Sequence, residues 1–373
     1  MDTARRPLSI AHVTGEAGFS GGEVQVFLLL EGLRKRGHRS ALVCPPGSES
    51  AREAVRRGFE VRCARMRSDA SLLGALRIRA HLRACRPDLV HLHTGRADWL
   101  GGLAAWQLGL PAITTRRMDR PVSHGLRKRF LYRRVVRRAV AISPAVRERL
   151  ILGGVAPEIT RVISSAVDPE ALRPRAERSA TRAREGLAED TPCLLALAAL
   201  VERKGIDVLL EAIARLDAHL PQPVLWIAGD GPERGALERR AGALGLAARV
   251  RFLGRRDDAA DLLAACDVFA LPSRLEGLGV AALEAMAAGR PVLASAVGGL
   301  AEAVAHEKTG LLVPPDDPGA LCAALARLLE DPALRKRLGD AGPARVRERY
   351  SAERMVEAYE ALYAEVLAEG GRP

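Results

Sequence analysis

The chain has 373 residues, of which 48% are apolar and 27% are charged, and its formal net charge is +12. This composition is that of a globular protein and excludes a disordered or collagen-like chain. Two domains are expected, because a single hydrophobic core stops growing near ~250 residues.

Sequence patterns argue against a membrane-spanning segment, a secretory signal, a disulfide framework and a zinc site. The longest fully apolar stretch, residues 193–201, is about half as long as a membrane span requires. The N-terminus shows no secretory signal, so we expect a cytoplasmic protein. The six cysteines lie apart in apolar surroundings without a C-x-x-C pair, which favours reduced thiols over a disulfide framework or a zinc site.

Positive charge is concentrated in the first half of the chain. Residues 1–170 hold 30 basic and 15 acidic residues, which leaves 27 basic and 30 acidic residues for the remainder. Only five of the 57 basic residues are lysine, so a coding bias toward arginine explains the abundance of arginine but not its uneven distribution.

Short apolar runs alternate with amphipathic stretches along the whole chain, as in βαβ units with parallel sheets. In the first half, this pattern predicts strands at residues 8–13, 40–43, 60–63, 89–92, 112–115, 139–142 and 162–163. A helix is expected at residues 22–36, because apolar residues recur there at helical spacing before Gly37. Further strands are expected at residues 193–199, 224–228, 250–252, 268–271, 292–294 and 311–313, followed by helical residues 332–369.

This alternation predicts an α/β protein with two tandem Rossmann-like, doubly wound domains at residues 1–170 and 192–350. Residues 171–191 are rich in charge and poor in apolar side chains, and we expect a partly helical interdomain linker there. In doubly wound sheets, ligands bind beyond the carboxyl ends of the strands. Functional residues are therefore sought in the loops that follow strands.

The segment 271–296 is the most informative of these loops. Glu276 follows a predicted strand, and the turn formed by Gly277, Leu278 and Gly279 opens a helix that carries Glu284. Bare backbone N–H groups and the helix dipole make such a turn an anion site, and the two carboxylates can accept hydrogen bonds from the hydroxyls of a sugar or ribose. The spacing of the two carboxylates is weak evidence for a site by itself, because Glu284 can also lie on a solvated helix face.

Two further loops point toward the same edge of the second sheet. Arg203 and Lys204 lie between a predicted strand and a helix, where they can bind a pyrophosphate or form an ordinary exposed basic turn. The loop at residues 228–232 (AGDGP) is favoured as a tight turn with Asp230 as a helix N-cap.

In this order along the chain, these motifs resemble those of the family 4 retaining glycosyltransferases of the GT-B fold. The resemblance covers almost the whole chain. It includes the Gly21-Gly22-Glu23 loop and the segments 88–93 (DLVHLH), 141–146 (AISPAV), 202–205 (ERKG), 228–232 (AGDGP), 252–254 (FLG) and 276–284 (E-x7-E).

The resemblance implies a nucleotide-sugar donor in the second domain, an acceptor in the first domain, and a C-terminal helix at residues 351–373 that packs on the first domain. It implies that Arg203 and Lys204 hold the donor diphosphate, that Glu276 contacts the donor sugar and that Glu284 contacts the ribose. Gly277, Leu278 and Gly279 would offer backbone N–H groups, Leu253 and Arg255 would flank the base, and Gly22 would let the first-domain loop approach a phosphate. We expect no cofactor and no metal, because these fixed cations and the helix start can stabilise a leaving nucleoside diphosphate.

The first domain departs from the family pattern at one candidate position. The family often has a histidine near the position of Arg116, so Arg116 or Arg117 is expected to supply a fixed cation instead. His91 and His93 alternate along one strand and face the same side. His93 lies nearer the strand end and is the better candidate for the site, although a packed histidine fits equally well.

Residues 116–138 hold ten basic residues and the single acidic residue Asp119. A helix at residues 123–138 would carry an apolar stripe between arginines, which is typical of peripheral binding to an anionic membrane. A helix that packs in the core with a solvated basic face is the alternative.

The function expected from these features is transfer of a hexosyl or related unit from a UDP- or GDP-sugar to a cell-envelope glycan or glycolipid, such as a lipopolysaccharide-type acceptor, on the cytoplasmic face of the membrane. A nucleotide-sugar epimerase on the same architecture is an alternative. A basic nucleic-acid-binding protein is disfavoured by the 3% aromatic content. A dinucleotide-dependent dehydrogenase is excluded, because no G-x-G-x-x-G follows the first predicted strand.

Overall fold

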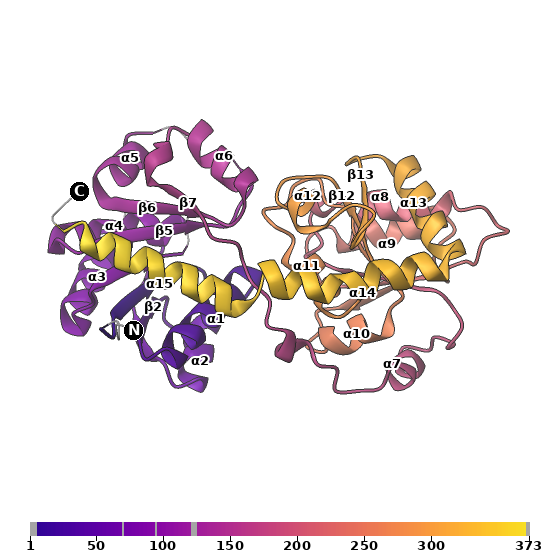
Figure 1. The fold of residues 1–373 in the computed structure, drawn as a ribbon, viewed down its shortest axis with the longest axis horizontal. Helices are drawn as coiled ribbons and strands as arrows, with labels where there is room; N and C mark the ends of the chain where they lie inside the picture. The colour runs from indigo at the N-terminus through magenta and orange to yellow at the C-terminus, as the bar shows by residue number, and fades with distance from the viewer. Residues whose placement is uncertain (1–5, 69–70, 94, 121–124, 371–373) are drawn as a thin grey trace. The chain divides into compact units, whose positions relative to one another are not determined.

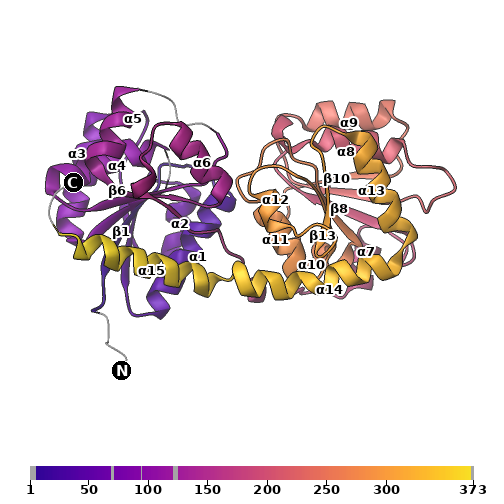
Figure 2. The same ribbon diagram turned by 45° about the horizontal axis from the view of Figure 1, so that its top comes forward.

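The computed structural model describes residues 6–68, 71–93, 95–120 and 125–370 (Figure 1). The chain divides into two compact units, of which the first comprises Met1–Ala166 and Ala352–Pro373 and the second Val167–Ser351. Each unit has a parallel sheet with helices on both faces (Figure 2). The α/β fold with two Rossmann-like sheets is therefore confirmed.

The first unit contains a seven-stranded parallel sheet in the order β3-β2-β1-β4-β5-β6-β7. Its strands are β1 (Ser9–Val13), β2 (Arg39–Cys44), β3 (Glu60–Cys63), β4 (Leu89–Leu92), β5 (Ala112–Arg116), β6 (Val136–Ala141) and β7 (Thr160–Val162). Strands β1 and β4 pair in the register His12 to His91, and the strand order reverses between them. Ligands of doubly wound sheets bind at such a switch point.

The helices of the first unit cover both faces of this sheet. They are α1 (Gly21–Lys35), α2 (Glu49–Arg56), α3 (Leu72–Cys85), α4 (Gly95–Leu108), α5 (Leu126–Phe130), the π-helical turn η1 (Leu131–Val135), α6 (Pro144–Leu152), the 3₁₀ turn η2 (Pro157–Ile159) and α15 (Ala352–Ala368). Helices α3 and α4 form one core with the sheet, while α1 and α15 form another with the opposite face.

The helix expected at residues 123–138 is wrong in its extent. The positions before Gly125 lie outside the described residues, α5 and η1 end at Val135, and Val136 already begins β6. Leu131, Val135 and Val136 are buried, and Phe130 packs edge-on against Trp106. The apolar stripe therefore belongs largely to the core, while most of the basic side chains of this segment and Leu126, at its start, reach the surface.

The second unit contains a six-stranded parallel sheet in the order β10-β9-β8-β11-β12-β13. The strands are β8 (Cys193–Leu197), β9 (Val224–Ala228), β10 (Val250–Gly254), β11 (Val268–Leu271), β12 (Val292–Ser295) and β13 (Gly310–Val313). The helices are α7 (Arg178–Arg184), α8 (Ile206–Ala214), α9 (Arg234–Ala243), α10 (Ala259–Ala265), α11 (Val280–Ala287), α12 (Leu300–Ala303), α13 (Pro318–Glu330) and α14 (Pro332–Arg349), with 3₁₀ turns η3 (Pro169–Leu172) and η4 (Glu202–Lys204).

Residues 171–191, which were expected to form a linker, are part of the second unit. Helix α7 packs on α10, and the buried Arg182 donates a hydrogen bond of 2.9 Å to the carbonyl oxygen of Ala265. Arg178 forms an ion pair of 2.7 Å with Asp267. The segment looks like a linker in sequence because ion pairs and backbone contacts, rather than apolar side chains, attach much of it to the unit.

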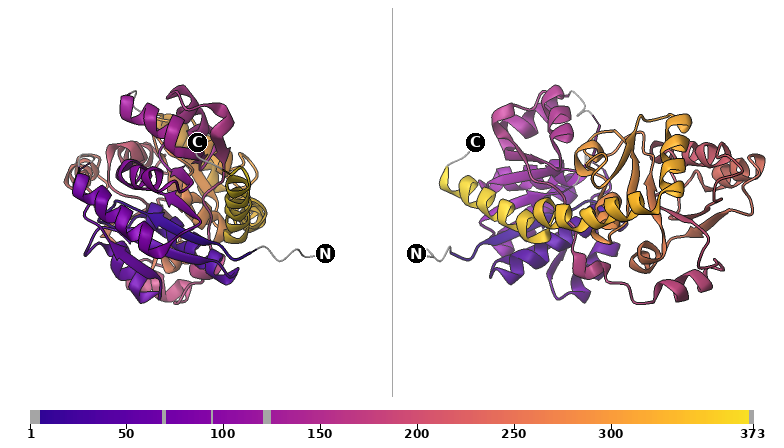
Figure 3. Two further views of the ribbon diagram at one scale, coloured as in Figure 1. Left: turned by 90° about the vertical axis from the view of Figure 1, so that its left-hand side faces the viewer. Right: turned by 45° about the vertical axis from the view of Figure 1, so that its right-hand side comes forward.

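Helix α15 belongs to the first unit, where it packs on α1 (Figure 3). Gly32 of α1 leaves room for Val356 of α15, because a Cβ atom at Gly32 would lie 2.2 Å from a Val356 methyl carbon. His38 and Arg36, which follow α1, both form hydrogen bonds with Glu360 and provide a second contact between α15 and the rest of the unit. No helix in the described part of the chain is long and apolar enough to cross a membrane.

Candidate active site

The switch point of the second sheet lies between β8 and β11, and the two loops that follow these strands contact each other. The backbone N–H of Arg274 donates 2.8 Å to the carbonyl oxygen of Arg203. Gly205 has φ +64°, and a Cβ atom there would lie 2.0 Å from the carbonyl oxygen of Pro272. Only glycine allows this approach, which brings Lys204 close to Glu276.

Lys204 and Glu276, both predicted as site residues, form an ion pair between these loops. Their side chains are largely buried, and Ser273 Oγ donates a further hydrogen bond of 3.3 Å to Glu276 Oε2. Arg203 lies beside this pair in η4, and its guanidinium has no partner within the part of the chain that the structure describes. Among the described residues, the side chain of Lys204 is therefore paired and that of its neighbour Arg203 is not, at the carboxyl edge of the sheet.

Arg274 is a site-supporting residue that the sequence patterns did not single out. Its guanidinium donates two hydrogen bonds, of 2.9 and 2.7 Å, to the carboxylate of Asp207 and one of 2.7 Å to the carbonyl oxygen of Glu202. These contacts join the two loops from the outside. In the sequence, its position two residues before Glu276 was the feature that could have indicated a role at the site.

Helix α11 starts next to this pair. Gly279, its N-cap, has φ +80° and makes no side-chain cap, so the first-turn N–H groups lack a capping side chain. Leu278 is buried, and a Cβ atom at Gly279 would lie 3.5 Å from Glu276 Cγ. Gly279 therefore brings backbone without a side chain close to Glu276, and the start of α11 has a geometry suited to an anion at a helix N-terminus.

Glu284 lies one turn into α11 and is half-buried. Burial raises the pKa of its carboxyl to about 7. No hydrogen-bond donor reaches this carboxyl among the described residues. A carboxylate that is desolvated without a partner is suited to accept hydrogen bonds from a ligand that brings its own hydroxyls.

The predicted base-flanking residues lie at the end of β10. The register of β10 against β9 shifts between Phe252 and Gly254, so Leu253 sits at a bulge, and Arg255 follows it on the surface. Gly229 donates from its N–H to the carbonyl oxygen of Gly254 over 2.8 Å. The turn and N-cap expected at residues 228–232 are displaced along the chain. The turn is closed by the Arg234 N–H, which donates to the carbonyl oxygen of Gly231 over 3.1 Å, the Asp230 carboxylate accepts from the N–H of Gly231, and Glu233 is the N-cap of α9.

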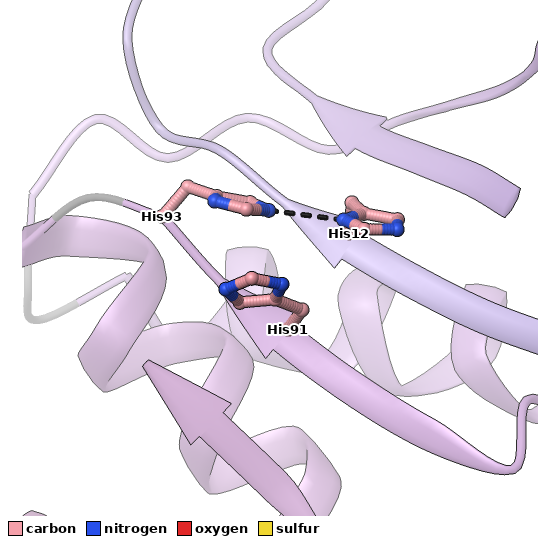
Figure 4. A group of neighbouring side chains, drawn as sticks. All are labelled: His12, His91 and His93. Carbon is pink, nitrogen blue, oxygen red and sulfur yellow. Dashed lines mark hydrogen bonds between the residues drawn. The ribbon is translucent and has the colours of Figure 1, made fainter. Parts of the chain in front are cut away.

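The first unit has a buried polar cluster at its own switch point (Figure 4). The rings of His12 from β1, His91 from β4 and His93 directly after β4 lie within 5.5 Å of one another, measured between ring centroids, and those of His12 and His93 are stacked. His91 lies between Tyr363 and Thr115, at 2.8 and 2.7 Å, and so acts as a packed histidine. His91 and His93 face the same side, as the strand alternation predicts.

The hydrogen bond from Arg117 determines which ring nitrogen carries the proton in His93 and, through His93, in His12. Its guanidinium donates to His93 Nδ1 over 3.2 Å, so His93 Nδ1 is an acceptor and Nε2 carries the proton. His93 Nε2 then donates to His12 Nδ1 over 3.0 Å, which leaves His12 Nε2 protonated and without a partner among the described residues. Burial, together with the charge of Arg117, lowers the pKa of His12 to about 3 and keeps the pKa of His93 well below its ordinary value.

Arg117, rather than Arg116, is therefore the cation that engages His93. Arg116 instead donates 2.8 Å to the carbonyl oxygen of Arg120. Gly22 lies beside Arg117 at the start of α1, where a Cβ atom would be 3.7 Å from Arg117 Cδ. Gly22 needs no special backbone conformation, so its lack of a side chain leaves space rather than relieving strain.

The three histidines are the only group among the described residues whose ligand atoms could together hold a metal ion. Both ring nitrogens of His91 and both of His93 are already hydrogen-bonded, and a guanidinium lies against His93. A cation would have to displace these bonds beside a fixed positive charge. The cluster therefore fits a hydrogen-bond relay and does not fit a metal site.

Comparisons with known proteins agree with this geometry. Residues 19–171 match the family model "Glycosyltransferase Family 4", and residues 177–345 match "Glycosyl transferases group 1". The chain is 31% identical over 356 residues to the lipopolysaccharide core biosynthesis glycosyltransferase LpsE of Rhizobium meliloti, which covers 93% of this chain and 97% of that protein. It is 38% identical over 206 residues, about half of each chain, to a GDP-mannose-dependent phosphatidylinositol monomannoside mannosyltransferase of Corynebacterium glutamicum.

Among solved structures, the complex of Anabaena HepE with UDP and glucose superposes with a TM-score of 0.85, at 23% identity, over 96% of this chain and all of that one. That likeness confirms the fold. The protein is an enzyme with the GT-B architecture, and it belongs to glycosyltransferase family 4.

Proposed function

We propose that this glycosyltransferase moves a hexosyl or related unit, with retention of configuration, from a UDP- or GDP-sugar to a cell-envelope glycan or a lipid-linked acceptor. The observation that carries this proposal is the Lys204 and Glu276 pair, which lies beside the uncompensated Arg203 and the uncapped start of α11. Cations and bare N–H groups suit a diphosphate, and a carboxylate within the same group suits sugar hydroxyls.

In the proposed donor complex, Arg203 and Lys204 bind the diphosphate, and the N–H groups at Gly277 to Gly279 complete the anion site. Glu276 accepts hydrogen bonds from the transferred sugar, and Glu284 accepts them from the ribose. Leu253 and Arg255 flank the base. The relatives' names support both a diphosphate donor and a glycan or lipid acceptor, because one relative is named as GDP-mannose-dependent and another as a lipopolysaccharide core enzyme.

The transfer reaction depends more on stabilisation of the leaving diphosphate than on a nucleophile supplied by the enzyme. The bond between the anomeric carbon and the diphosphate oxygen breaks, the acceptor oxygen bonds to the same face of that carbon, and the acceptor proton leaves with the diphosphate. Negative charge develops on the diphosphate, where fixed cations and a helix N-terminus lower the barrier without reorganisation. These residues supply the positive charge that a divalent metal would otherwise supply, so we propose transfer without a metal or cofactor.

For a lipid-borne acceptor, we propose that the enzyme works in the cytoplasm at the inner face of the membrane. Residues 116–138 contribute charge to such a contact, since Arg127, Arg129, Arg133 and Arg134 are exposed. Among their apolar neighbours, Leu131, Val135 and Val136 are buried, and Leu126 is exposed as a single side chain. The contribution of this segment is therefore mainly electrostatic and should weaken with salt.

A thermal-shift panel of UDP- and GDP-sugars tests the donor. A true donor at 100 times its dissociation constant adds about 2.7 kcal/mol of stability, whereas the other nucleotide sugars shift the melting temperature little. Product analysis with donor alone and with donor plus a glycolipid extract then separates transfer from epimerisation. Conversion of the donor to its epimer without acceptor, or stabilisation by no nucleotide sugar, would refute the proposal.

A further inference from the structure

Three leucines at the start of α3 form the largest run of exposed apolar side chains in the described structure. Leu72, Leu73 and Leu76 are exposed to 75, 76 and 52%. At spacings of three and four residues, their side chains lie on one side of the helix. The other large exposed apolar side chains of the described residues stand singly along the chain, as is normal on a protein surface. We call Leu72, Leu73 and Leu76 the α3 leucine patch.

Packing does not account for the exposure of these leucines. The inner face of α3 buries Ala75, Ile78 and Leu82 against the sheet and α4, so the helix has its core contacts without the patch. Ser71 caps the helix N-terminus by accepting a hydrogen bond of 3.2 Å from the N–H of Gly74. The first turn therefore presents the leucines from a well-anchored helix.

Arginines border the patch along the chain. Six arginines and one acidic residue occur between positions 65 and 86. Arg65 and Arg67 precede the helix, and the Arg65 carbonyl oxygen lies 2.6 Å from where a Cβ atom of Gly74 would be, beside the patch. Arg77 follows Leu76 on the exposed surface. None of these three arginines forms an ion pair within the described residues, whereas Arg56, Arg57 and Arg62 elsewhere in this unit all do.

We propose that the α3 leucine patch and its arginines dock the first unit on an anionic lipid bilayer, with the leucines inserted into the interface and the arginines at the headgroups. An apolar helix surface bordered by arginine is the composition that membrane interfaces bind. A second copy of the chain fits poorly. Three leucines are a small fraction of the area that a stable dimer buries, and a two-fold contact would bring identical arginines together.

This surface explains how a protein with no membrane-spanning helix in its described part can reach a lipid-borne substrate. It extends the proposed function and places the apolar contact on α3 rather than at residues 116–138, where Leu131, Val135 and Val136 are buried. The carboxyl ends of β1 and β4 and the N-terminus of α3 lie at the same edge of the sheet, because a crossover helix runs antiparallel to its strands. A bilayer on α3 would therefore lie on the switch-point side of the first unit.

The test is cosedimentation of the full chain with vesicles of phosphatidylcholine alone or with about one third phosphatidylglycerol. The double variant Leu72→Ser, Leu73→Ser is compared with a matched control, Val55→Ser, Leu152→Ser, whose parent side chains are 67 and 61% exposed on α2 and α6. All four positions are exposed, so both variants should melt like the parent chain. Vesicle binding is measured without donor or acceptor, so it can succeed or fail separately from the transferase assignment.

We expect the parent chain to bind only the anionic vesicles, with an affinity that falls as salt rises. The patch variant should lose at least tenfold in affinity, because burying one leucine already accounts for about that factor, and the control should bind like the parent chain. Equal binding by the patch variant and the control would overturn the proposal, as would parent binding that is indifferent to phosphatidylglycerol. A dimeric parent chain that becomes monomeric only in the patch variant would assign the patch to a second copy instead.

Discussion

Lys204 and Glu276 form an ion pair that joins the loop after β8 to the loop after β11, although 72 residues separate them in sequence. Both side chains are largely buried, so each compensates the charge of the other before any ligand arrives. A bound diphosphate and sugar would share this pair. Its removal should therefore affect catalysis more than an exposed ion pair does.

Replacing either member should strongly reduce transfer. Lys204→Ala and Glu276→Ala are each expected to lower kcat/KM by roughly 10²- to 10³-fold, because each removes a charge that acts on the developing transition state. Lys336→Ala is the matched control, since Lys336 forms an exposed ion pair of 2.6 Å with Asp340 in α14. Full activity in Lys204→Ala or Glu276→Ala, measured as initial rates with a confirmed donor, would contradict the assigned site.

Glu284 should link activity and stability to pH in opposite directions. Burial raises its pKa from 4.5 in the unfolded chain to about 7, so between these values the folded state binds more protons than the unfolded state. Stability from this group is therefore present below pH 4.5 and is lost as pH rises to 7. Glu284→Gln removes the cost of the buried charge and should stabilise the protein at pH 8 by up to about 3 kcal/mol.

The same substitution should weaken donor binding at pH 8, because an amide replaces the carboxylate that accepts from the ribose. Isothermal titration with the nucleoside diphosphate and thermal denaturation, both as a function of pH, check the two effects. Donor affinity of the parent chain should fall as pH drops below 7, and Glu284→Gln should lack this dependence. A variant that loses stability at pH 8, or that keeps the pH dependence, would show that another group is responsible.

His93 should act by holding Arg117 and not by transferring a proton. Its Nδ1 accepts from Arg117, and its pKa is lowered by burial and by neighbouring charge, so it is neutral across the range in which the enzyme is assayed. His93→Gln keeps an acceptor near Arg117 and should retain most activity, whereas His93→Ala should lose about tenfold. The pH–rate profile of His93→Gln should match that of the parent chain. Equal inactivity of both variants would favour proton transfer by His93.

Two glycines in loops should respond differently to alanine. Gly22→Ala should change stability by less than about 1 kcal/mol, because its backbone is unstrained and its Cβ atom would make only ordinary contacts. Gly205→Ala should lose more than about 3 kcal/mol, since its φ is +64° and its Cβ atom would lie 2.0 Å from the carbonyl oxygen of Pro272. Chemical denaturation measures both.

If the Gly22 loop approaches a substrate phosphate, Gly22→Ala should still raise KM for donor or acceptor. A variant with normal stability and a raised KM assigns the space beside Arg117 to a ligand. Unchanged kinetics would mean that only solvent fills the space beside Arg117.

Periodicity in the sequence was sufficient to locate the strands. The predicted strands at residues 60–63, 89–92, 224–228 and 268–271 match β3, β4, β9 and β11 in their bounds. Buried parallel strands are short, apolar and bordered by turn residues, so their pattern depends mainly on local sequence. For the same reason, loops such as those of Lys204 and Glu276 could be placed at strand ends in advance.

Only the tertiary structure decided which side chains meet. Val135 and Val136 extend a helical pattern in sequence, yet β6 begins at Val136, because pairing with β5 outweighs local helix propensity. The choice of Arg117 over Arg116 follows from strand alternation against His93, and the attachment of residues 171–191 follows from partners such as Asp267 that are remote in the chain. Local sequence determines periodicity and turns, whereas the pairing of charges and the exposure of Leu72 and Leu73 depend on neighbours that only folding brings together.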